Sequence, residues 1–179
     1  MNTPENLLAF RQAALRANLR TIGCEFDGSG DSGSINGVGP IRWNAGGIDA
    51  SCVHLGLDEL MPKLMTCYMT REKNWDFEQN KLVLVPEASL LEQLAKEHNI
   101  DLDMVFYSVL EHFPGDWVND AGGYGTAYLD LATGQYHIDG YQRYESQDAA
   151  DASGTFFDTP LATTNPVDDT ADYIKTLLQ

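Results

Sequence analysis

The alternation of residues 126–144 constrains the fold of this chain more than any other feature. Thr126–Leu131 and Gln135–Tyr144 each alternate large apolar residues with polar ones, and Ala132-Thr133-Gly134 between them has the composition of a turn. A period of two residues places successive side chains on opposite faces of a strand. The pattern therefore predicts a β-hairpin in an antiparallel sheet that is covered on one face.

Helical periodicity marks three other segments. Thr3-Pro4-Glu5 combines a capping hydroxyl, a proline in the first turn and an acidic residue, so it predicts the start of an amphipathic helix that continues to about Arg20. A second helix is expected over Ser89–His98, and a third over residues 101–113 with Asp101 or Asp103 as its cap. Short strands are expected at residues 21–26, 34–38 and 81–85.

These elements predict an α+β fold in which helices pack on a small antiparallel sheet built from hairpins. We expect one domain over residues 1–145, with an irregular insertion between residues 39 and 81. Residues 146–179 are rich in Asp, Ala, Ser, Thr and Pro, which indicates an acidic C-terminal extension that is closed by a short helix near residues 168–178.

Charge restricts the partners of the chain. Eleven Lys and Arg residues stand against 27 Asp and Glu residues, which gives a net charge of −16 and a pI near 4.3. Residues 1–98 carry a net charge of −4 and residues 99–179 carry −12, so the C-terminal half is the acidic pole. A chain of this charge repels polyanions, which argues against direct nucleic-acid binding and favours a basic protein partner.

The cysteines and the hydropathy of the chain predict its location. Cys24, Cys52 and Cys67 form no Cys-x-x-Cys pair or Cys/His cluster of the kind that binds zinc, so reduced thiols are expected. No apolar stretch is long enough to span a bilayer, and the first twenty residues lack the pattern of a signal peptide. We therefore expect a cytoplasmic protein with no membrane partner.

Phe26–Gly33, with the sequence FDGSGDSG, is the most unusual string in the chain. Asp27, Ser29 and Asp31 alternate as the oxygen ligands of calcium loops do, although Ser32 and Val38 stand where an EF-hand needs Gly and Glu. A divalent cation such as Mg²⁺ could use these carboxylates. The structural alternative is the tip of a hairpin with a long polar loop, where Asp and Ser cap backbone amides and Gly adopts positive φ.

A second glycine-rich segment, Trp117–Gly125, places Asn119 and Asp120 before two glycines and Tyr124. Asp120 could supply a third oxygen to a metal near Asp27 if the two segments pack together. Asp120 and Tyr124 could also act as acid and base or hold a polar ligand. The structural alternative makes Asp120 a turn residue and the two aromatic residues parts of the core.

Tyrosines concentrate in the predicted final hairpin together with carboxylates and one cation. This set fits either core and rim positions or a protein-binding face, in which tyrosines are anchors surrounded by acids. The histidines are scattered, and no nucleotide-binding or hydrolase motif of the common kinds occurs in the sequence. The candidate binding residues are Asp27, Ser29, Asp31, Asp120, Tyr124, Asp130, Asp139, Tyr141 and Arg143.

Over about residues 20–145 the chain resembles an uncharacterised family of small acidic proteins from bacterial plasmids and phages. The resemblance rests on FDGSGDSG after a short strand, on Trp-x-Asn-Asp followed by Tyr-Gly, and on a Tyr-x-Arg-Tyr hairpin end. The bend departs from the family pattern Asn-Asp-Gly-Ala-Tyr-Gly by one additional residue. The resemblance implies the context of a mobile element, in which small acidic proteins often inhibit host defence.

Three functions follow as hypotheses. The first is an acidic inhibitor that occupies the basic nucleic-acid-binding groove of a host defence nuclease or CRISPR effector, without a cofactor, as anti-CRISPR and antirestriction proteins do. The second is a metal-dependent hydrolase that uses Asp27, Asp31 and Asp120 and a divalent cation. In the third the charge serves solubility alone. The uneven charge favours the first hypothesis and the glycine-rich carboxylate loops favour the second.

Overall fold

The structure is a computed structural model that describes residues 2–45, 48–69, 73–76, 78, 80–143, 148–157 and 161. Its helices are α1 (Pro4–Arg16), α2 (Leu57–Leu60), the 3₁₀ helix η1 (Met61–Thr66), α3 (Pro86–Glu97) and α4 (Leu102–Leu110). Its strands are β1 (Thr21–Ser29), β2 (Ser32–Gly39), β3 (Ile41–Ala45), β4 (Ile48–Ser51), β5 (Cys67–Met69), β6 (Lys73–Asp76), β7 (Lys81–Leu84), β8 (Gly123–Asp130), β9 (Gln135–Gln142) and β10 (Asp148–Thr155).

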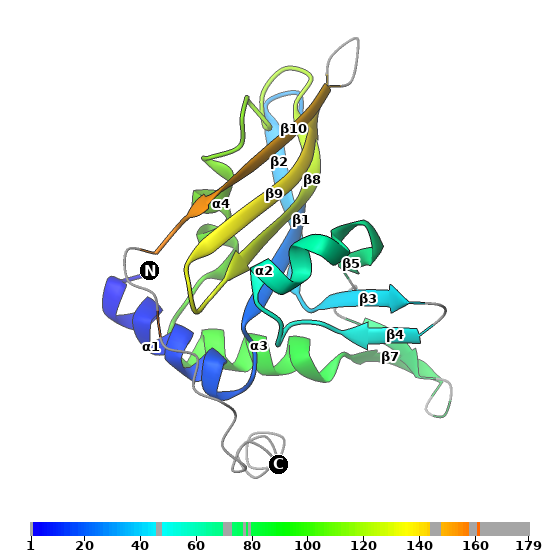
Figure 1. Cartoon of the computed structure of the whole chain (residues 1–179), viewed down its shortest axis with the longest axis vertical. Helices are drawn as coiled ribbons and strands as arrows, with labels where there is room; N and C mark the ends of the chain where they lie inside the picture. The colour runs from blue at the N-terminus through cyan, green and yellow to red at the C-terminus, as the bar shows by residue number, and fades with distance from the viewer. Residues whose placement is uncertain are drawn as a thin grey trace.

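The centre of the fold is a five-stranded sheet with the order β10-β9-β8-β1-β2, in which every neighbouring pair is antiparallel. The predicted hairpin of β8 and β9 lies in its middle (Figure 1). Separate antiparallel sheets join β4-β3-β5 and β6-β7. The α+β prediction is therefore confirmed.

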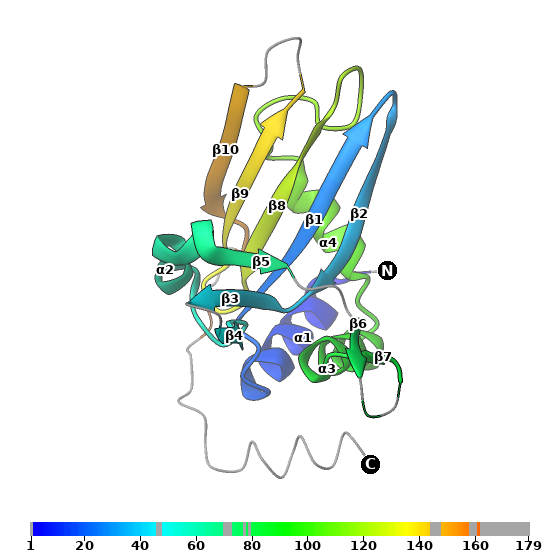
Figure 2. The same ribbon diagram turned by 90° about the vertical axis from the view of Figure 1, so that its right-hand side faces the viewer.

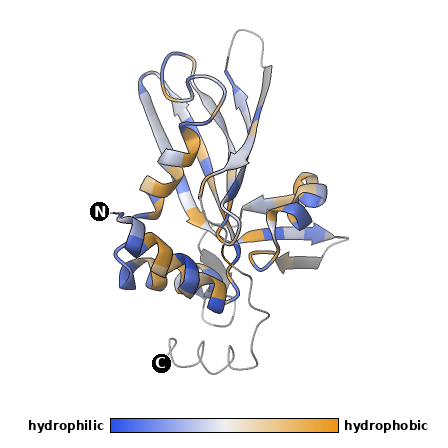
Figure 3. Ribbon diagram, turned by 60° about the vertical axis from the view of Figure 1, so that its left-hand side comes forward, coloured by the Kyte–Doolittle hydropathy of each residue, from blue (hydrophilic) through white to orange (hydrophobic). Residues whose placement is uncertain are grey.

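Helices α1, α3 and α4 cover one face of the large sheet and form the main core with it. Phe10 of α1, Leu94 of α3 and Phe106 of α4 are almost completely buried, as are Ile22 and Leu129 on the strands beneath. Orange, apolar segments in Figure 3 run along these helices, whereas the upper ends of the strands are pale or blue. Hydrophobic burial against this face holds the helices in place.

The opposite face of the large sheet is covered only at its base within the described residues. There β3 and β5 cross in front of the strands, with α2 beside them (Figure 2). Tyr128 of β8 packs into a small second core with Ile41, Leu57 and Leu60. Above this point Figure 2 shows no described helix or strand in front of the sheet.

Local sequence signals predicted most helix positions. Thr3 caps α1, and its side chain accepts a hydrogen bond from the Asn6 amide, as expected. The helix ends at Arg16 instead of Arg20, because Asn18 takes a left-handed conformation with φ of 59°. Asp101 is the N-cap of α4, and its side chain accepts a hydrogen bond from the Met104 amide. Of the two capping residues predicted from the sequence, Asp101 and Asp103, the structure therefore uses Asp101.

Three segments differ from the sequence-based expectation. The expected long polar loop is a two-residue turn at Gly30 and Asp31, both with positive φ, because β1 and β2 stay paired up to Ser29 and Ser32. Residues 39–81 hold short strands and α2. The large sheet continues beyond residue 145 with β10, which pairs with β9 without a register shift. The helix expected near residues 168–178 lies outside the described residues.

Candidate functional site

The uncovered part of the large sheet gathers most of the candidate binding residues. We call this surface the open face; it consists of Glu25, Asp27, Tyr124, Thr126, Asp139, Tyr141, Arg143 and Asp151. On neighbouring strands these residues occupy the positions that alternate with the buried core residues, so their side chains leave the sheet on the side away from the helices. Asp27, Tyr124, Asp139, Tyr141 and Arg143 were all expected from the sequence.

An aromatic and ionic cluster forms the upper end of the open face. Asp27, Tyr124 and Tyr141 are cross-strand neighbours, and the two tyrosine rings stack with centroids 5.6 Å apart. The Arg143 guanidinium donates to the Asp27 carboxylate at 2.9 and 3.1 Å and to the Gly28 carbonyl oxygen at 2.7 Å. It also lies 4.8 Å from the Tyr124 ring centre. The cluster ties the β1–β2 hairpin to the end of β9.

These contacts also fix the charge of the cluster. The hydrogen bond from Arg143 to Asp27 raises the pKa of the guanidinium, which therefore stays protonated. The Asp27 carboxylate is paired with Arg143 of the same chain, and the positive charge of Arg143 offsets its negative charge.

The next row of the open face is different, because no cation of the described residues pairs with its carboxylates. Register pairs Glu25 with Thr126, Thr126 with Asp139, and Asp139 with Asp151. All three acidic side chains are exposed, and none forms a hydrogen bond or ion pair with another described residue. Asp139 and Asp151 stand directly opposite each other, an arrangement that destabilises a sheet. We call Glu25, Asp139 and Asp151 the acid row.

The base of the same face lies under α2 and is occupied by structural contacts. His137 Nδ1 lies 2.7 Å from the Ser153 hydroxyl oxygen. Burial, together with the charge of Asp139, raises the pKa of Tyr128 to about 12. Thus Tyr128 is a neutral phenol in the second core.

Asp130, which the sequence placed in the binding set, is completely buried at this base. Its carboxylate forms an ion pair with Arg20 at 3.1 Å and accepts hydrogen bonds from the amides of Leu57, Ala132 and Thr133. Its role is therefore to join β8 to the start of α2 and to the turn after β8.

The two glycine-rich segments do pack against each other at the sheet tip. The Gly30 amide donates to the Asp120 carbonyl oxygen at 2.9 Å, and a Cβ at Gly122, whose φ is +72°, would collide with the Gly28 carbonyl. Trp117 lies against Gly28 in the same way. Close backbone approach thus requires glycine at positions 28 and 122.

This arrangement brings together no cluster of metal ligands among the described residues. Asp31 sits in the two-residue turn with φ of 66°, and Asp120 lies in the bend with φ of 55°. Ser29 is exposed at the end of β1, where its carbonyl accepts from Ser32. Among the described residues no group of three or more His, Cys, Asp and Glu side chains is placed to hold a metal ion.

Sequence reasoning missed Glu25 and Asp151. Glu25 stands two residues before Asp27, and strand alternation alone could have placed it on the same face. Asp151 lies in the segment for which the sequence predicts an extension, and only its register against Asp139 brings it to the face.

Within the described residues, every helix is too short or too polar to cross a membrane. Comparison of the chain with protein-family models, with curated proteins and with solved structures gave no match.

Proposed function

We propose that this chain is a binding protein whose open face docks on a basic surface of a protein partner and excludes nucleic acid from it. The observation that carries the proposal is the acid row, three carboxylates in one row of the sheet, in which Thr126 separates Glu25 from Asp139 and no described cation lies beside them. Their mutual repulsion costs the free protein stability, and a cationic partner would relieve it.

The spacing of the acids suits this role. Side chains directly opposite on neighbouring strands lie about 5 Å apart, so Asp139 and Asp151 are adjacent, and Glu25 continues the line of negative charge beyond Thr126. A groove that binds nucleic acid has Lys and Arg side chains spaced to meet phosphates, and the line of carboxylates offers them an alternative counter-charge. Tyr141, which is 41% exposed beside the row, adds an aromatic surface of the kind found at interface hot spots.

Two exposed methionines lie beside the open face. Met61 and Met65 of η1 are 41% and 101% exposed, and η1 follows α2 on the same side of the sheet. Flexible methionine side chains adapt to varied protein surfaces. We therefore expect Met65 to contribute to the interface, whereas Met104 on α4, which is also exposed, lies on the helix side of the sheet.

The test compares two variants with equal net charge. One neutralises the acid row by Glu25→Gln, Asp139→Asn and Asp151→Asn, and the other neutralises Glu92, Glu97 and Glu111 on the helix side. Each tagged variant is used beside the original protein to capture partners from a bacterial lysate at low and high salt. The proposal predicts that the original protein and the helix-side variant recover the same basic nucleic-acid-binding protein at low salt, and that the acid-row variant does not.

Recovery by the acid-row variant at the level of the original protein would show that general charge, and not this face, attracts the partner. Recovery that persists unchanged in high salt would also oppose the proposal, because contacts between exposed charges are screened there. With the captured partner in hand, Met65→Ala is expected to weaken binding, with Met104→Ala as its control.

A further inference from the structure

Strand β10 is one edge of the large sheet, and Figure 2 shows no described helix or strand beside its outer side. Its pairing with β9 covers eight residues without a register shift, and its sequence, Asp-Ala-Ala-Asp-Ala-Ser-Gly-Thr, contains neither Pro nor Lys. Proteins use prolines, lysines and bulges to keep an edge strand from accepting another strand. β10 has none of these features, although it is as long as β8 and β9.

The register shows which backbone groups of β10 face outward. In an antiparallel sheet, successive residues direct their N–H and C=O groups alternately toward one neighbouring strand and the other. The Arg143 amide donates to the Gly122 carbonyl oxygen, which directs the odd-numbered residues of β9 toward β8 and the even-numbered ones toward β10. The Phe156 amide donates to the Gly134 carbonyl oxygen, which likewise directs the even-numbered residues of β10 toward β9. The outward backbone groups of β10 therefore belong to Ala149, Asp151, Ser153 and Thr155.

The other edge of the sheet, β2, is closed in a way that β10 is not. Its pairing with β1 shifts register between Cys24 and Phe26. Tyr107 of α4 donates a hydrogen bond to the Gly33 carbonyl oxygen of β2 at 3.3 Å. Bulges and covering helices are both means of protecting an edge. Strand addition is therefore expected at β10 and not at β2.

The two sides of the β10 edge differ in chemistry. On the open face, Asp151 is exposed and stands opposite Asp139, so a strand added to β10 would place a residue next in line to the acid row. On the helix side, Ala152 and Phe156 are half-buried against the main core, so the alternate residues of an added strand would extend an apolar margin. The edge thus suits a strand in which Lys or Arg alternates with apolar residues.

The open-face side of this edge also has room for a long side chain. A hollow of about 370 Å³ lies between the end of β10 and the helices α2 and η1, and Ser153 is part of its lining. Leu57 and Met61 form the apolar part of its wall. A Lys or Arg opposite Ser153 would lay its aliphatic stem against these two residues and keep its charged end in water.

We infer that β10 receives an extended segment of the protein partner as a sixth strand of the large sheet, and that Lys or Arg alternates with apolar residues in this segment. The inference rests on the proposed function for the basic character of the partner, and it adds the way in which the partner is held. A second copy of this chain is a poor occupant, because both edges would carry Asp151 and each copy has a net charge of −16.

The probe is the peptide acetyl-Thr-Lys-Val-Lys-Val-Lys-Thr-amide, titrated into the ¹⁵N-labelled protein. Two matched peptides are compared with it: Thr-Lys-Lys-Val-Val-Lys-Thr has the same composition without the alternation, and Thr-Glu-Val-Glu-Val-Glu-Thr has the alternation with the opposite charge. We expect saturable binding of the first peptide, with slowed hydrogen exchange of the Asp151 and Ser153 amides. Affinity for each of the other two peptides should be lower by about tenfold or more.

Two substitutions at one position test the outward amide itself. Ser153→Pro and Ser153→Ala both lose the hydroxyl and its contact with His137, and only the proline also removes the N–H group. Proline is tolerated there because the Ser153 amide points away from the ladder with β9. We expect the alternating lysine peptide to bind Ser153→Pro about tenfold more weakly than Ser153→Ala.

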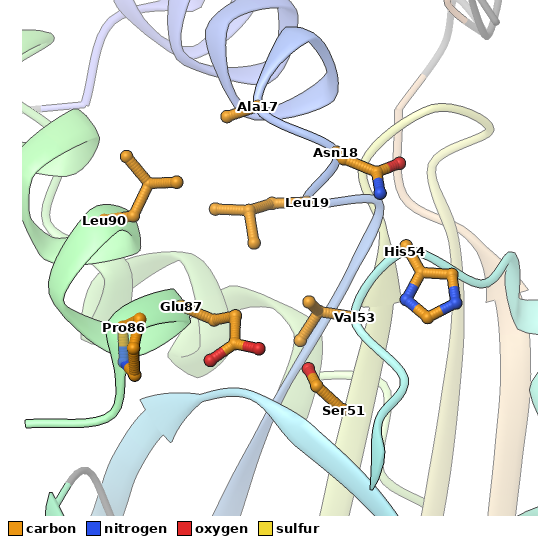
Figure 4. A pocket seen from close by; sticks show the side chains of 9 residues that line it. All are labelled: Ala17, Asn18, Leu19, Ser51, Val53, His54, Pro86, Glu87 and Leu90. Atoms are coloured by element: carbon orange, nitrogen blue, oxygen red, sulfur yellow. The ribbon is translucent and has the colours of Figure 1, made fainter. Parts of the chain in front are cut away.

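Several results would overturn the inference. These are no saturable binding of the alternating lysine peptide, equal binding of the two lysine peptides, and equal affinity of Ser153→Pro and Ser153→Ala. Slow exchange of the Asp151 and Ser153 amides in the free protein would also oppose it, because this chain or a second copy would then already cover the edge. So would shifts confined to Leu19 and Leu90, which line a separate cavity between α1 and α3 without any residue of β9 or β10 (Figure 4).

Failure of this inference can be told apart from failure of the proposed function. Equal binding of the two lysine peptides, lost when the acid row is neutralised, would leave docking by charge intact and remove only strand addition. Capture from lysate that ignores the acid row would instead remove the proposed function. If Ser153→Pro does not fold, the comparison of the three peptides on the original protein still decides, because only strand addition distinguishes the two lysine sequences.

Discussion

The acid row makes a prediction about the stability of the protein without any partner. Asp139 and Asp151 are directly opposed on β9 and β10. Two unit charges about 5 Å apart in water repel each other by about 0.8 kcal/mol. Asp151→Asn keeps the shape of the side chain and removes this repulsion, so it should raise the free energy of unfolding by about 0.5–1 kcal/mol at low salt.

The double-mutant cycle identifies the cause of the gain. Asp139→Asn should stabilise the protein at least as much as Asp151→Asn, since Asp139 also faces Glu25 across Thr126. Combining the two substitutions should add little to the larger single effect, because one repulsion is removed only once. In ~1 M salt, where the screening length is about 3 Å, the gains should nearly vanish.

Urea denaturation of the four proteins at low and high salt measures these values. The reasoning is refuted if Asp151→Asn lowers stability at low salt, if the two gains add fully, or if they persist in ~1 M salt. A confirmed gain would mean that the natural sequence keeps a destabilising pair of charges on an exposed face, which is typical of residues retained for function.

Other predictions concern groups inside the fold. Asp130→Ala should lower the free energy of unfolding by about 3–5 kcal/mol in urea denaturation, because it removes the buried partner of Arg20, which keeps only Asp58 and Glu59 at 3.7 Å, and the acceptor of three amide hydrogen bonds. The pKa of Tyr128 is raised to about 12 in the folded protein, so the unfolded chain releases this proton first. The free energy of unfolding should therefore fall by about 3 kcal/mol between about pH 10 and 12. Denaturation measured across this pH range should show the decline in the original protein and not in Tyr128→Phe. Burial raises the pKa of the Cys24 thiol, so a thiol reagent at neutral pH should label half-buried Cys67 first and Cys24 only on unfolding, as mass spectrometry can verify.

Local patterns in the sequence predicted the parts of the fold that form from neighbouring residues. The hairpin of β8 and β9 alternates clearly, and the helices carry caps such as Thr3 and Asp101 beside a periodic apolar face. Each of these signals lies within one stretch of chain, so it does not depend on distant contacts.

The missed elements depend on contacts between distant residues. β10 has the sequence Asp-Ala-Ala-Asp-Ala-Ser-Gly-Thr, whose residues have mostly low strand propensity, and pairing with β9 determines its structure. The strands between residues 41 and 76 have only three to five residues each, too few for a period to be recognised. The open face could be predicted only in part, because alternation gives the face of each residue but not the register between strands.

The most direct test of the central claim is competition for one surface. A partner captured through the acid row is purified, loaded with fluorescently labelled nucleic acid, and titrated with this protein while fluorescence anisotropy reports release. We predict that the nucleic acid is released completely at one equivalent, and that it rebinds when this protein is removed. Nucleic acid that stays bound at saturating protein, or a partner that remains inactive after the protein is removed, would contradict occupation of the groove by the open face.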